Sequence, residues 1–548
     1  MSDSLDQASS DDSELPPIVE LDNLAISDAD DFPTHSEIFA ARTIVSSAKQ
    51  ELEELESRII ELKRTIAHNQ RIIFSINRIP IEILLLIFLY TIRPKSGMIR
   101  TVLVSGPWLV SGVCRHWRRV ALSSPSLWSF PTIYPVPNQS VSHFNLQLFR
   151  SGTTGALHPF LSAPQHDIHH LLRLIPRLIP TSNRWASLTM AFDWTHPRMK
   201  PVIAPLLDNV KSLEELQIEG FWEHPLSAIT KLTLFSCAPR LTKLSVSGVC
   251  EPAVSLVLPW HQLTHYRAIG TAHEHIAVLE RCRGSLISAH LGFHSPEFIA
   301  EKGRTERIVL PQLRHLYAGE ADLLHVLSMP NLHSVVVQKI AGGVVNNDVA
   351  NNAAAAVVDA CLPLLRFIRR DRPTALSSIS LRQSTLVAPT LLSIMEDSCV
   401  QCSLHTLSFH LNRGSIGAIN ELIARLRAVP ATEDEVEIEI VAPHLTTLHL
   451  SGRALGSPSF NHALFVDMID SRTRIHPRLQ RLKRLTLQTT PKKLIPSPVI
   501  GRLNALSTER GFGLDVSSSY LDGEQTGGAT GSDKYWWAMN GVMAGWMY

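Results

Sequence analysis

The stretch SGVCRHWRRVALSSPSLWSF, residues 111–130, concentrates side chains that could do chemistry. Its cysteine and histidine could ligate zinc, its arginines beside an aromatic ring could bind nucleic acid, and its tryptophans on an apolar frame could dock a partner. At helical spacing, Val113, Trp117 and Val120 share one side. We therefore interpret the stretch as a packed helix with arginines along a solvated or partner-facing edge, and we predict no nucleic-acid partner.

A zinc site is not predicted from the cysteines and histidines. A structural zinc ion needs four ligands, and Cys114 and His116 have no second pair of ligands nearby. Cys399 and Cys402 have the spacing of a zinc finger, but the histidines that follow are too close in sequence to complete one. We expect no metal site.

Signatures of catalysis are missing from the sequence. It contains no nucleophile elbow, no phosphate-binding loop, no Gly-x-Gly-x-x-Gly fingerprint and no His-Glu-x-x-His motif. The 25 histidines are spread along the chain, and spacing alone assembles no nucleophile, base and orienting group. We therefore expect a protein that is not an enzyme and that binds no cofactor.

The composition limits the kinds of protein to which this chain can belong. A chain of 548 residues, 45% of them hydrophobic, can form two or more domains or one long repeat array. Seven scattered cysteines favour reduced thiols and a cytoplasmic and/or nuclear protein. The most apolar run, residues 79–92, contains Glu82 and is too short to cross a bilayer, so no membrane is expected as a partner. Residues 1–36 carry ten Asp or Glu and no Lys or Arg, which predicts a disordered acidic tail.

Residues 37–77 are predicted to form a coiled coil. Apolar residues recur at alternating spacings of three and four, with Glu, Lys and Arg between them. The a and d positions are Val45, Ala48, Leu52, Leu55, Ile59, Leu62, Ile66, Asn69, Ile73 and Ile76. The helix either pairs with a second copy, which would give a homodimer, or lies on its own domain. Pro80 ends it, because a proline biases the residue before it away from the helical region.

Residues 78–130 are predicted to form a small helical unit. A short helix begins at Pro80, with Ile83, Ile87 and Leu84 on its inner face and Phe88 beside them. A loop over residues 93–108 contains Gly and Pro, and the helix of residues 109–122 follows. The unit has more large apolar residues than it can cover by itself. Surplus apolar surface rimmed by charge indicates a site for a partner.

A short phrase, Leu-x-x-Leu-x-Leu or a close variant, recurs over residues 181–490. Clear copies are LEELQI at 213, LTKLSV at 241, LHTLSF at 404, LTTLHL at 445 and LKRLTL at 482. Helical patterns such as AHEHIAVLERC lie between the phrases. A repeated strand, turn and helix cannot bury its own apolar face, so stacked units form a curved solenoid.

The repeat region resembles irregular leucine-rich-repeat proteins. The predicted fold class is therefore α/β, with an N-terminal coiled coil, a small helical unit and an irregular leucine-rich-repeat solenoid. Residues 131–180 are expected to be a linker or helical connection. Residues 491–548, which are rich in tryptophan near their end, are expected to be a tail or a cap.

The third and fifth residues of each phrase point away from the core leucines and form a candidate substrate face. They are mostly Ser, Thr, His, Lys and Arg, which would suit an acidic or phosphorylated peptide but would equally suit a merely soluble strand face. The candidate residues are Lys243, Arg267, His315, Tyr317, His449 and Arg484.

The helical unit resembles the F-box, whose pattern is Leu-Pro-x-Glu, then Ile-Phe, then Val-Cys-Arg/Lys-x-Trp, then Leu-Trp. The positions that match are Pro80, Glu82, Ile87, Phe88, Val113, Cys114, Arg115, Trp117, Leu127 and Trp128. Ile79 replaces the usual leucine, and the loop over residues 93–108 is longer than in the family. The whole layout is similar to that of F-box proteins of the expanded families in mushroom-forming fungi.

The resemblance implies binding and not catalysis. It implies that the F-box docks on the Skp adaptor of a Skp–cullin–F-box ubiquitin ligase, which includes a cullin scaffold, while the repeats bind an unknown protein substrate. Expected adaptor contacts, or residues supporting them, are Ile79, Pro80, Ile83, Ile87, Phe88, Val113 and Cys114. Expected core residues are Trp117, Leu122, Leu127 and Trp128. The alternative is a non-catalytic coiled-coil and solenoid scaffold that acts outside a ubiquitin ligase.

Overall fold

The structure is a computed structural model. The chain divides into two compact units, Met1–Leu84 and Leu85–Tyr548. Most of the expected acidic tail, and residues 519–548 of the expected tail or cap, lie outside the described residues. The structure describes residues 34–73, 79–92, 101–134, 140–163, 168–194, 196–207, 209–219, 231–247, 252–293, 307–339, 361–382, 386–411, 413–427, 441–474, 478–489 and 494–518.

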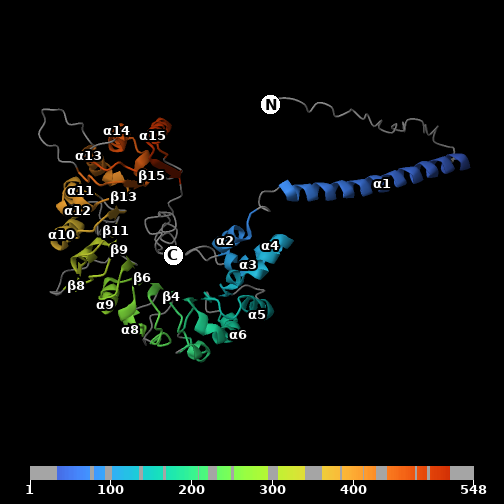
Figure 1. The fold of residues 1–548 in the computed structure, drawn as a ribbon, viewed down its shortest axis with the longest axis horizontal. Coiled ribbons are helices and arrows are strands. Elements are labelled where there is room, and N and C mark those ends of the chain that lie inside the picture. The colour runs from blue at the N-terminus through green and yellow to red at the C-terminus, as the bar shows by residue number, and fades with distance from the viewer. Residues whose placement is uncertain are drawn as a thin grey trace, which may run out of the picture. The chain divides into compact units, whose positions relative to one another are not determined.

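The first unit contains one long helix, α1 (His35–Ile73), in the range where a coiled coil is predicted (Figure 1). A capping box begins it. The Thr34 N–H donates to Glu37 Oε2 at 2.7 Å, and the Glu37 N–H donates to Thr34 Oγ1 at 3.4 Å. Every residue from His35 to Gln70 is exposed, so the helix forms with its apolar a and d positions open to solvent.

Four short helices occupy the predicted F-box region. They are α2 (Ile81–Ile92), α3 (Thr101–Val113), α4 (Arg115–Ser123) and the 3-10 helix η3 (Pro125–Trp128). Part of this order departs from expectation, because residues 101–108 are helical and not a loop.

The expected helix over residues 109–122 is interrupted at Cys114. The backbone of Cys114 is extended, with φ −156° and ψ 172°, and its Sγ accepts a hydrogen bond from the Trp117 N–H at 3.4 Å. Cys114 is therefore the N-cap of α4, and it satisfies one of the N–H groups that the first helical turn leaves open. The interruption allows α3 and α4 to lie as separate helices.

The second unit is built on one parallel sheet of 14 strands among its described residues, and neighbouring strands follow one another in chain order. A parallel sheet in sequential order is the topology of a solenoid, so the expected α/β repeat architecture is confirmed at this level. The strands are β1 (Thr132–Ile133), β2 (Phe160–Ser162), β3 (Ser187–Ala191), β4 (Glu215–Glu219), β5 (Lys243–Ser247), β6 (His265–Gly270), β7 (Ser288–Phe293), β9 (His315–Glu320), β11 (Ser334–Lys339), β12 (Ser378–Leu381), β13 (Thr406–His410), β14 (Thr447–Ser451), β15 (Arg484–Thr489) and β16 (Gly513–Ser518). A separate parallel pair joins β8 (Ile308–Val309) and β10 (Leu327–Ser328).

Helices return the chain from one strand to the next, and Figure 1 shows them along the outer side of the sheet. The apolar side of each helix packs on the apolar side of the strands, in one continuous core. The helices are α5 (Val141–Arg150), α6 (His169–Leu178), α7 (Met199–Ile203), α8 (Pro252–Ser255), α9 (Ala272–Cys282), α10 (Leu362–Asp371), α11 (Ala388–Met395), α12 (Ser398–Ser403), α13 (Ile416–Leu426), α14 (His462–Thr473) and α15 (Ser497–Arg510).

A hydrogen-bond pattern recurs where the strands begin. The Thr242 carbonyl accepts the N–H groups of Thr264 and His265, and the carbonyl of Thr264 accepts those of Ile287 and Ser288. The same pattern continues at each later strand of the 14-stranded sheet up to β15. It fixes the register of each phrase against the next and thereby stacks the buried leucines in columns.

The repeat region is longer than predicted. The sheet begins at Thr132, within the expected linker, and ends at Ser518, beyond the expected limit of residue 490. The strands β1 and β2 have two and three residues and contain no Leu-x-x-Leu-x-Leu phrase. Their pairing comes from their position beside the next repeat, which a phrase search does not detect.

Arg472 joins two repeats near the C-terminal end of the solenoid. Its side chain is buried, and it donates to the Leu426 carbonyl at 2.6 Å, to the Ala442 carbonyl at 2.9 Å and to the Val441 carbonyl. Burial lowers the pKa of the guanidinium to about 10, so Arg472 stays charged at neutral pH. Ala442 has a positive φ of 48°, and the bonds from Arg472 hold this unfavourable backbone in place.

We expect Arg472→Leu to lower the free energy of unfolding by about 3 kcal/mol, because three buried carbonyl oxygens lose a charged donor. Urea denaturation measures the change. The matched control is Arg502→Leu, because Arg502 is exposed and lies 3.5 Å from Asp467. Its effect should stay within about 0.5 kcal/mol. Equal effects of the two substitutions would contradict the role assigned to Arg472.

Candidate functional site

The helices α2, α3 and α4 pack through a small aromatic and aliphatic contact. The rings of Phe88 on α2 and Trp117 on α4 lie with their centroids 4.8 Å apart. Gly106 on α3 lies against Ile92, where a Cβ atom would meet the Ile92 side chain at 3.2 Å. The buried residues of α2 are Leu84, Phe88 and Ile92, which are four residues apart. The expected inner face is confirmed at Leu84 and wrong at Ile83 and Ile87, which are exposed.

The residues expected to contact the adaptor therefore differ in exposure. Ile87 is 42% exposed and Val113 is 61% exposed, and both are large apolar side chains. Leu86 on α2 and Leu109 on α3 add to this apolar exposure, although the motif did not single them out. We call Leu86, Ile87, Leu109 and Val113 the apolar helix residues. One feature of the sequence indicated Leu86 and Leu109: the helical unit has more leucines than three short helices can bury.

The other expected adaptor residues are placed as follows. Phe88 is 1% exposed, so of the two expected roles, contact or support, only support of its neighbours is open to it. Pro80 and Ile83 are exposed, Ile79 is half-buried, and Cys114 is half-buried as the cap of α4.

The expected core residues are also divided. Leu127 and Trp128 are fully buried, and Trp117 is half-buried against Phe88. Leu122 is 43% exposed, so its assignment to the core is wrong. It lies in the last turn of α4, on the side away from the buried pair Val120 and Ala121.

Trp128 is the centre of the junction between the helices and the solenoid. Its indole N–H donates to the Ala121 carbonyl at 2.8 Å, and the ring of Trp108 meets it edge-on at 4.9 Å. The Arg150 guanidinium on α5 lies over both rings, 4.7 Å from Trp108 and 4.5 Å from Trp128. This stack ties α3, α4 and α5 together.

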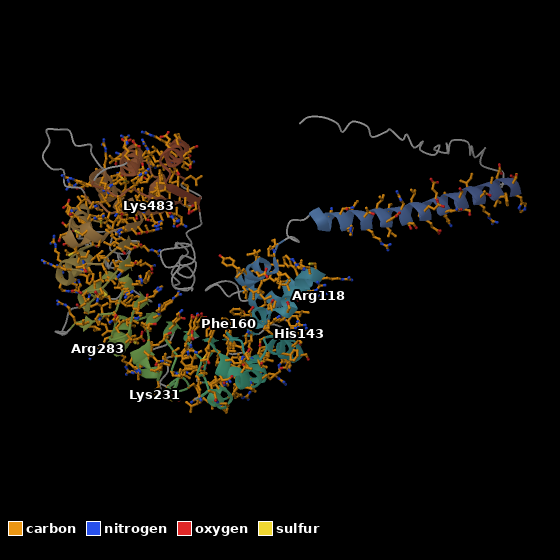
Figure 2. All side chains as sticks on the ribbon, in the orientation of Figure 1. Arg118, His143, Phe160, Lys231, Arg283 and Lys483 are labelled. Carbon is orange, nitrogen blue, oxygen red and sulfur yellow. The ribbon has the colours of Figure 1, made fainter. Side chains whose placement is uncertain are left out.

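Backbone bonds extend this junction into the sheet. The His158 N–H donates to the Ser129 carbonyl at 2.8 Å, and the Phe160 N–H donates to the Pro131 carbonyl at 3.0 Å. Gln147 on α5 donates through Nε2 to the Phe130 carbonyl at 3.1 Å. In Figure 2, Arg118 and His143 lie on the helical part and Phe160 marks strand β2 beside it. The helical part is therefore continuous with the first repeat.

The candidate substrate face divides into separate groups. Lys243 is half-buried on β5 and pairs in register with His265, while Arg267 is half-buried on the adjacent strand β6. Arg484 on β15 is eight strand spacings from β5, roughly 38 Å along the sheet. The structure brings Lys243 and Arg267 together and leaves Arg484 apart.

The remaining candidates on this face carry no positive charge at neutral pH. Tyr317 is 1% exposed, so it was wrong to expect its ring at the surface, and it packs on His290 with ring centroids 4.1 Å apart. Burial lowers the pKa of His315 and of His449, and neighbouring cations lower each of them further. Positive charge on this face therefore comes from lysine and arginine, and Glu215 on β4 lies opposite Lys243 in the register.

Arg382 is a cation that the sequence reasoning missed. It directly follows β12, is nearly buried, and lies close enough to His290 and His410 to lower the pKa of both, after desolvation by burial. The available signal was its position immediately after the phrase LSSISL.

A pocket at the C-terminal end is lined by Thr473, Arg481, Glu509, Arg510 and Arg474. Its arginines are used within the fold, since Arg481 donates to the Thr473 carbonyl at 2.9 Å and to the Arg510 carbonyl at 2.7 Å. We therefore assign the pocket to the packing of α14 on α15.

Within the described ranges, no group of three or more His, Cys, Asp or Glu residues is arranged to hold a metal ion. None of the helices in that part of the chain is both long and apolar enough to span a membrane.

Comparison with known proteins leaves the family of this chain open. No protein-family model matches it, and no curated protein matches it. A similar solved structure is the leucine-rich repeat-containing protein LegL7 from Legionella pneumophila, at 14% identity and a TM-score of 0.31. The match covers 64% of this chain and 96% of that one. At this TM-score we draw nothing from the likeness, and the repeat fold is assigned from the strand order.

Stability of the solenoid should fall in mild acid because of His410. Its Nδ1 lies 3.1 Å from Ser451 Oγ, and the Ser451 hydroxyl donates to the Phe409 carbonyl, so Nδ1 must carry the hydrogen. Burial, helped by the charge of Arg382, lowers the pKa of His410 from 6.5 to about 4. Between these values the unfolded chain takes up a proton that the folded chain does not, so stability is lost as the pH falls.

From pH 7 to pH 5 we expect His410 to contribute a loss of about 2 kcal/mol in the free energy of unfolding. His410→Gln should reduce the loss, while the exposed control His261→Gln should leave it unchanged. Urea denaturation at the two pH values measures this. The assignment fails if both variants keep the pH dependence of the parent protein.

Proposed function

We propose that this protein is a substrate-recognition adaptor of a Skp–cullin–F-box ubiquitin ligase. The helices α2 to α4 would dock on the Skp adaptor, which binds the cullin scaffold, and the strand face would hold the substrate. No catalytic step is assigned to this chain. The proposal rests on the F-box resemblance of residues 78–130 together with the exposure of the apolar helix residues.

The observation that carries the proposal is the division of the motif into packed and exposed positions. Phe88, Leu127 and Trp128 are buried, whereas the equally apolar Ile87 and Val113 face solvent. Together with Leu86 and Leu109, these two side chains leave apolar surface on α2 and α3 that a partner could cover. Burial of one such side chain on a partner is worth about 1.5–3 kcal/mol, so a few of them suffice for a specific contact.

The junction at Trp128 supports the same proposal. An adaptor must hold its substrate at a fixed position relative to the ligase, and a flexible connection would not do so. Here the backbone bonds from Ser129 and Pro131 to the first repeat, and the Arg150 stack on Trp128, leave little freedom between the docking helices and the solenoid.

We expect Ile87→Asp to weaken binding of the full chain to a purified fungal Skp adaptor by roughly a hundredfold, because a charge replaces a buried aliphatic contact. Isothermal titration calorimetry measures the affinity. The control is Leu146→Asp on α5, a similarly exposed apolar residue outside the motif, which should bind as the parent protein does.

Two results would overturn the docking proposal. One is the absence of binding by the folded parent chain, which would favour a scaffold acting outside a ubiquitin ligase. The other is binding that Ile87→Asp and Leu146→Asp reduce equally, because that would place the contact elsewhere.

For the substrate we propose an acidic or phosphorylated peptide segment, held by Lys243 and Arg267 on adjacent strands. Paired charge reversal, Lys243→Glu with Arg267→Glu, should abolish binding to an array of acidic phosphoserine peptides. Arg484→Glu, a distant cation, should leave it intact. Equal retention by both variants would contradict the proposal without affecting the docking surface on α2 and α3.

A further inference from the structure

The helix α1 exposes a long apolar stripe. It spans 39 residues, roughly 58 Å at 1.5 Å per residue, and its large aliphatic residues are about half exposed, as in Leu52 at 56% and Leu55 at 58%. A single helix gains little from such a stripe in water, since most helical stability in proteins comes from packing an apolar face. We therefore expect a second apolar surface to pack against the stripe.

The heptad positions are set by the residues of the stripe. Val45, Leu52, Ile59 and Ile66 occupy a, and Ala48, Leu55, Leu62 and Asn69 occupy d. The flanking g positions then hold Glu51 and Arg58, and the e positions hold Glu56 and Lys63. In two-stranded coiled coils the e and g residues set the partner and the orientation.

We propose that α1 pairs with α1 of a second copy of this chain in an antiparallel coiled coil, related by a two-fold axis beside Ser57. An antiparallel pair places a positions opposite d positions. The layers are then Val45 against Asn69, Ala48 against Ile66, Leu52 against Leu62, and Leu55 against Ile59 of the second copy. Each of the eight a and d residues from Val45 to Asn69 thus has a partner in a core layer. The smallest of them, Ala48, lies opposite the large Ile66.

Charge selects this orientation over the parallel one. In a parallel in-register pair, g faces e of the next heptad, so Glu51 would face Glu56 and Arg58 would face Lys63 of the second copy. Both contacts join like charges. In the antiparallel pair, g faces g and e faces e, so Glu51 faces Arg58 and Glu56 faces Lys63. Both contacts join opposite charges, and the two-fold axis makes each of them twice.

Two other contacts could work against the antiparallel orientation, and neither is strong enough to reverse it. Within one helix, Arg58 lies 3.1 Å from Glu61, but both side chains are about two-thirds exposed and such a pair contributes little. A parallel dimer would also pair Asn69 with Asn69, whereas here Asn69 lies in the terminal layer, where water reaches its amide. The like-charge contacts of the parallel form outweigh that single polar pair.

One consequence concerns where the two chains leave the coiled coil. Pairing about Ser57 puts the two copies of Ile73 at opposite ends, roughly 48 Å apart along the axis. The two chains therefore leave the coiled coil at opposite ends.

Disulfide mapping on the full chain tests the orientation. In the double variant Ala48→Cys with Ile66→Cys, the antiparallel pair brings Cys at position 48 opposite Cys at position 66 of the other copy. A parallel pair would link 48 with 48 and 66 with 66. The two positions are roughly 27 Å apart on one helix and cannot bond within a chain. Trypsin separates them, because Lys49, Lys63 and Arg64 lie between them, and mass spectrometry identifies the linked peptides.

Sedimentation equilibrium of full-length charge variants tests it independently. Glu51→Lys turns the contact with Arg58 into a repulsion in the antiparallel pair, so we expect the dimer dissociation constant to rise roughly tenfold. In a parallel pair the same change would face Glu56 and tighten the dimer. The control Glu53→Lys makes the same charge change at a b position and should alter the constant by no more than about twofold.

Linked 48–66 peptides together with a weaker Glu51→Lys dimer would support the proposal. Linked 48–48 peptides, or a tighter Glu51→Lys dimer, would overturn it in favour of a parallel pair. A monomeric parent chain, or a dimer that Leu52→Asp leaves intact, would overturn the pairing of α1 altogether. None of these outcomes depends on binding to a Skp adaptor, so the two proposals can fail separately.

Discussion

From β4 to β15, each strand of the 14-stranded sheet depends on a carbonyl group that belongs to the repeat before it. Where a strand begins, one carbonyl accepts two consecutive N–H groups of the next repeat, as the Thr242 carbonyl does for Thr264 and His265. This contact holds successive phrases in one register and forms a buried column along the sheet. Its members are Leu216, Leu244, Tyr266, Ala289, Leu316, Val335, Ile379, Leu407, Leu448 and Leu485, and the partly buried Leu514 ends it.

The same dependence creates a problem at the first repeat, which has no earlier neighbour to cover it. The helices α3 to α5 take that place, with Trp128 packed under Trp108 and Arg150, and Ile133 already part of the continuous core. One side of the short helices is thus committed to the solenoid. The apolar side chains that remain, such as Ile87 and Val113, are those for which the fold itself has no use. The same packing of the short helices therefore covers the first repeat and leaves Ile87 and Val113 exposed for the proposed docking.

Electrostatics matters in two different ways in this chain. On the strand face, burial removes charge from His315, His410 and His449, so that permanent cations dominate. On α1, where every residue from His35 to Gln70 is exposed, individual ion pairs are weak, and charge acts through the choice between orientations. The loss of histidine charge on the strand face depends on how deeply each side chain is buried. The choice of orientation on α1 depends on the heptad position of each charged residue.

The sequence by itself determined those features that depend on local periodicity. The 3-4 spacing located α1 to within a few residues, and the Leu-x-x-Leu-x-Leu phrases located the strands of the main sheet from β4 to β15. Both signals exist because a helix or strand that buries one face repeats its apolar residues at a fixed spacing. It also identified the residues of the helical unit, since Leu127 and Trp128 stand out by size.

Only the tertiary structure decided which apolar residues are buried and where the repeats begin. Ile83 and Phe88 are equally apolar, yet the direction from which α4 approaches α2 buries one and exposes the other. The strands β1 and β2 exist because a neighbouring repeat supplies their hydrogen bonds, not because of their own residues. Burial and pairing are properties of neighbours distant in the chain, and a single sequence records them only indirectly.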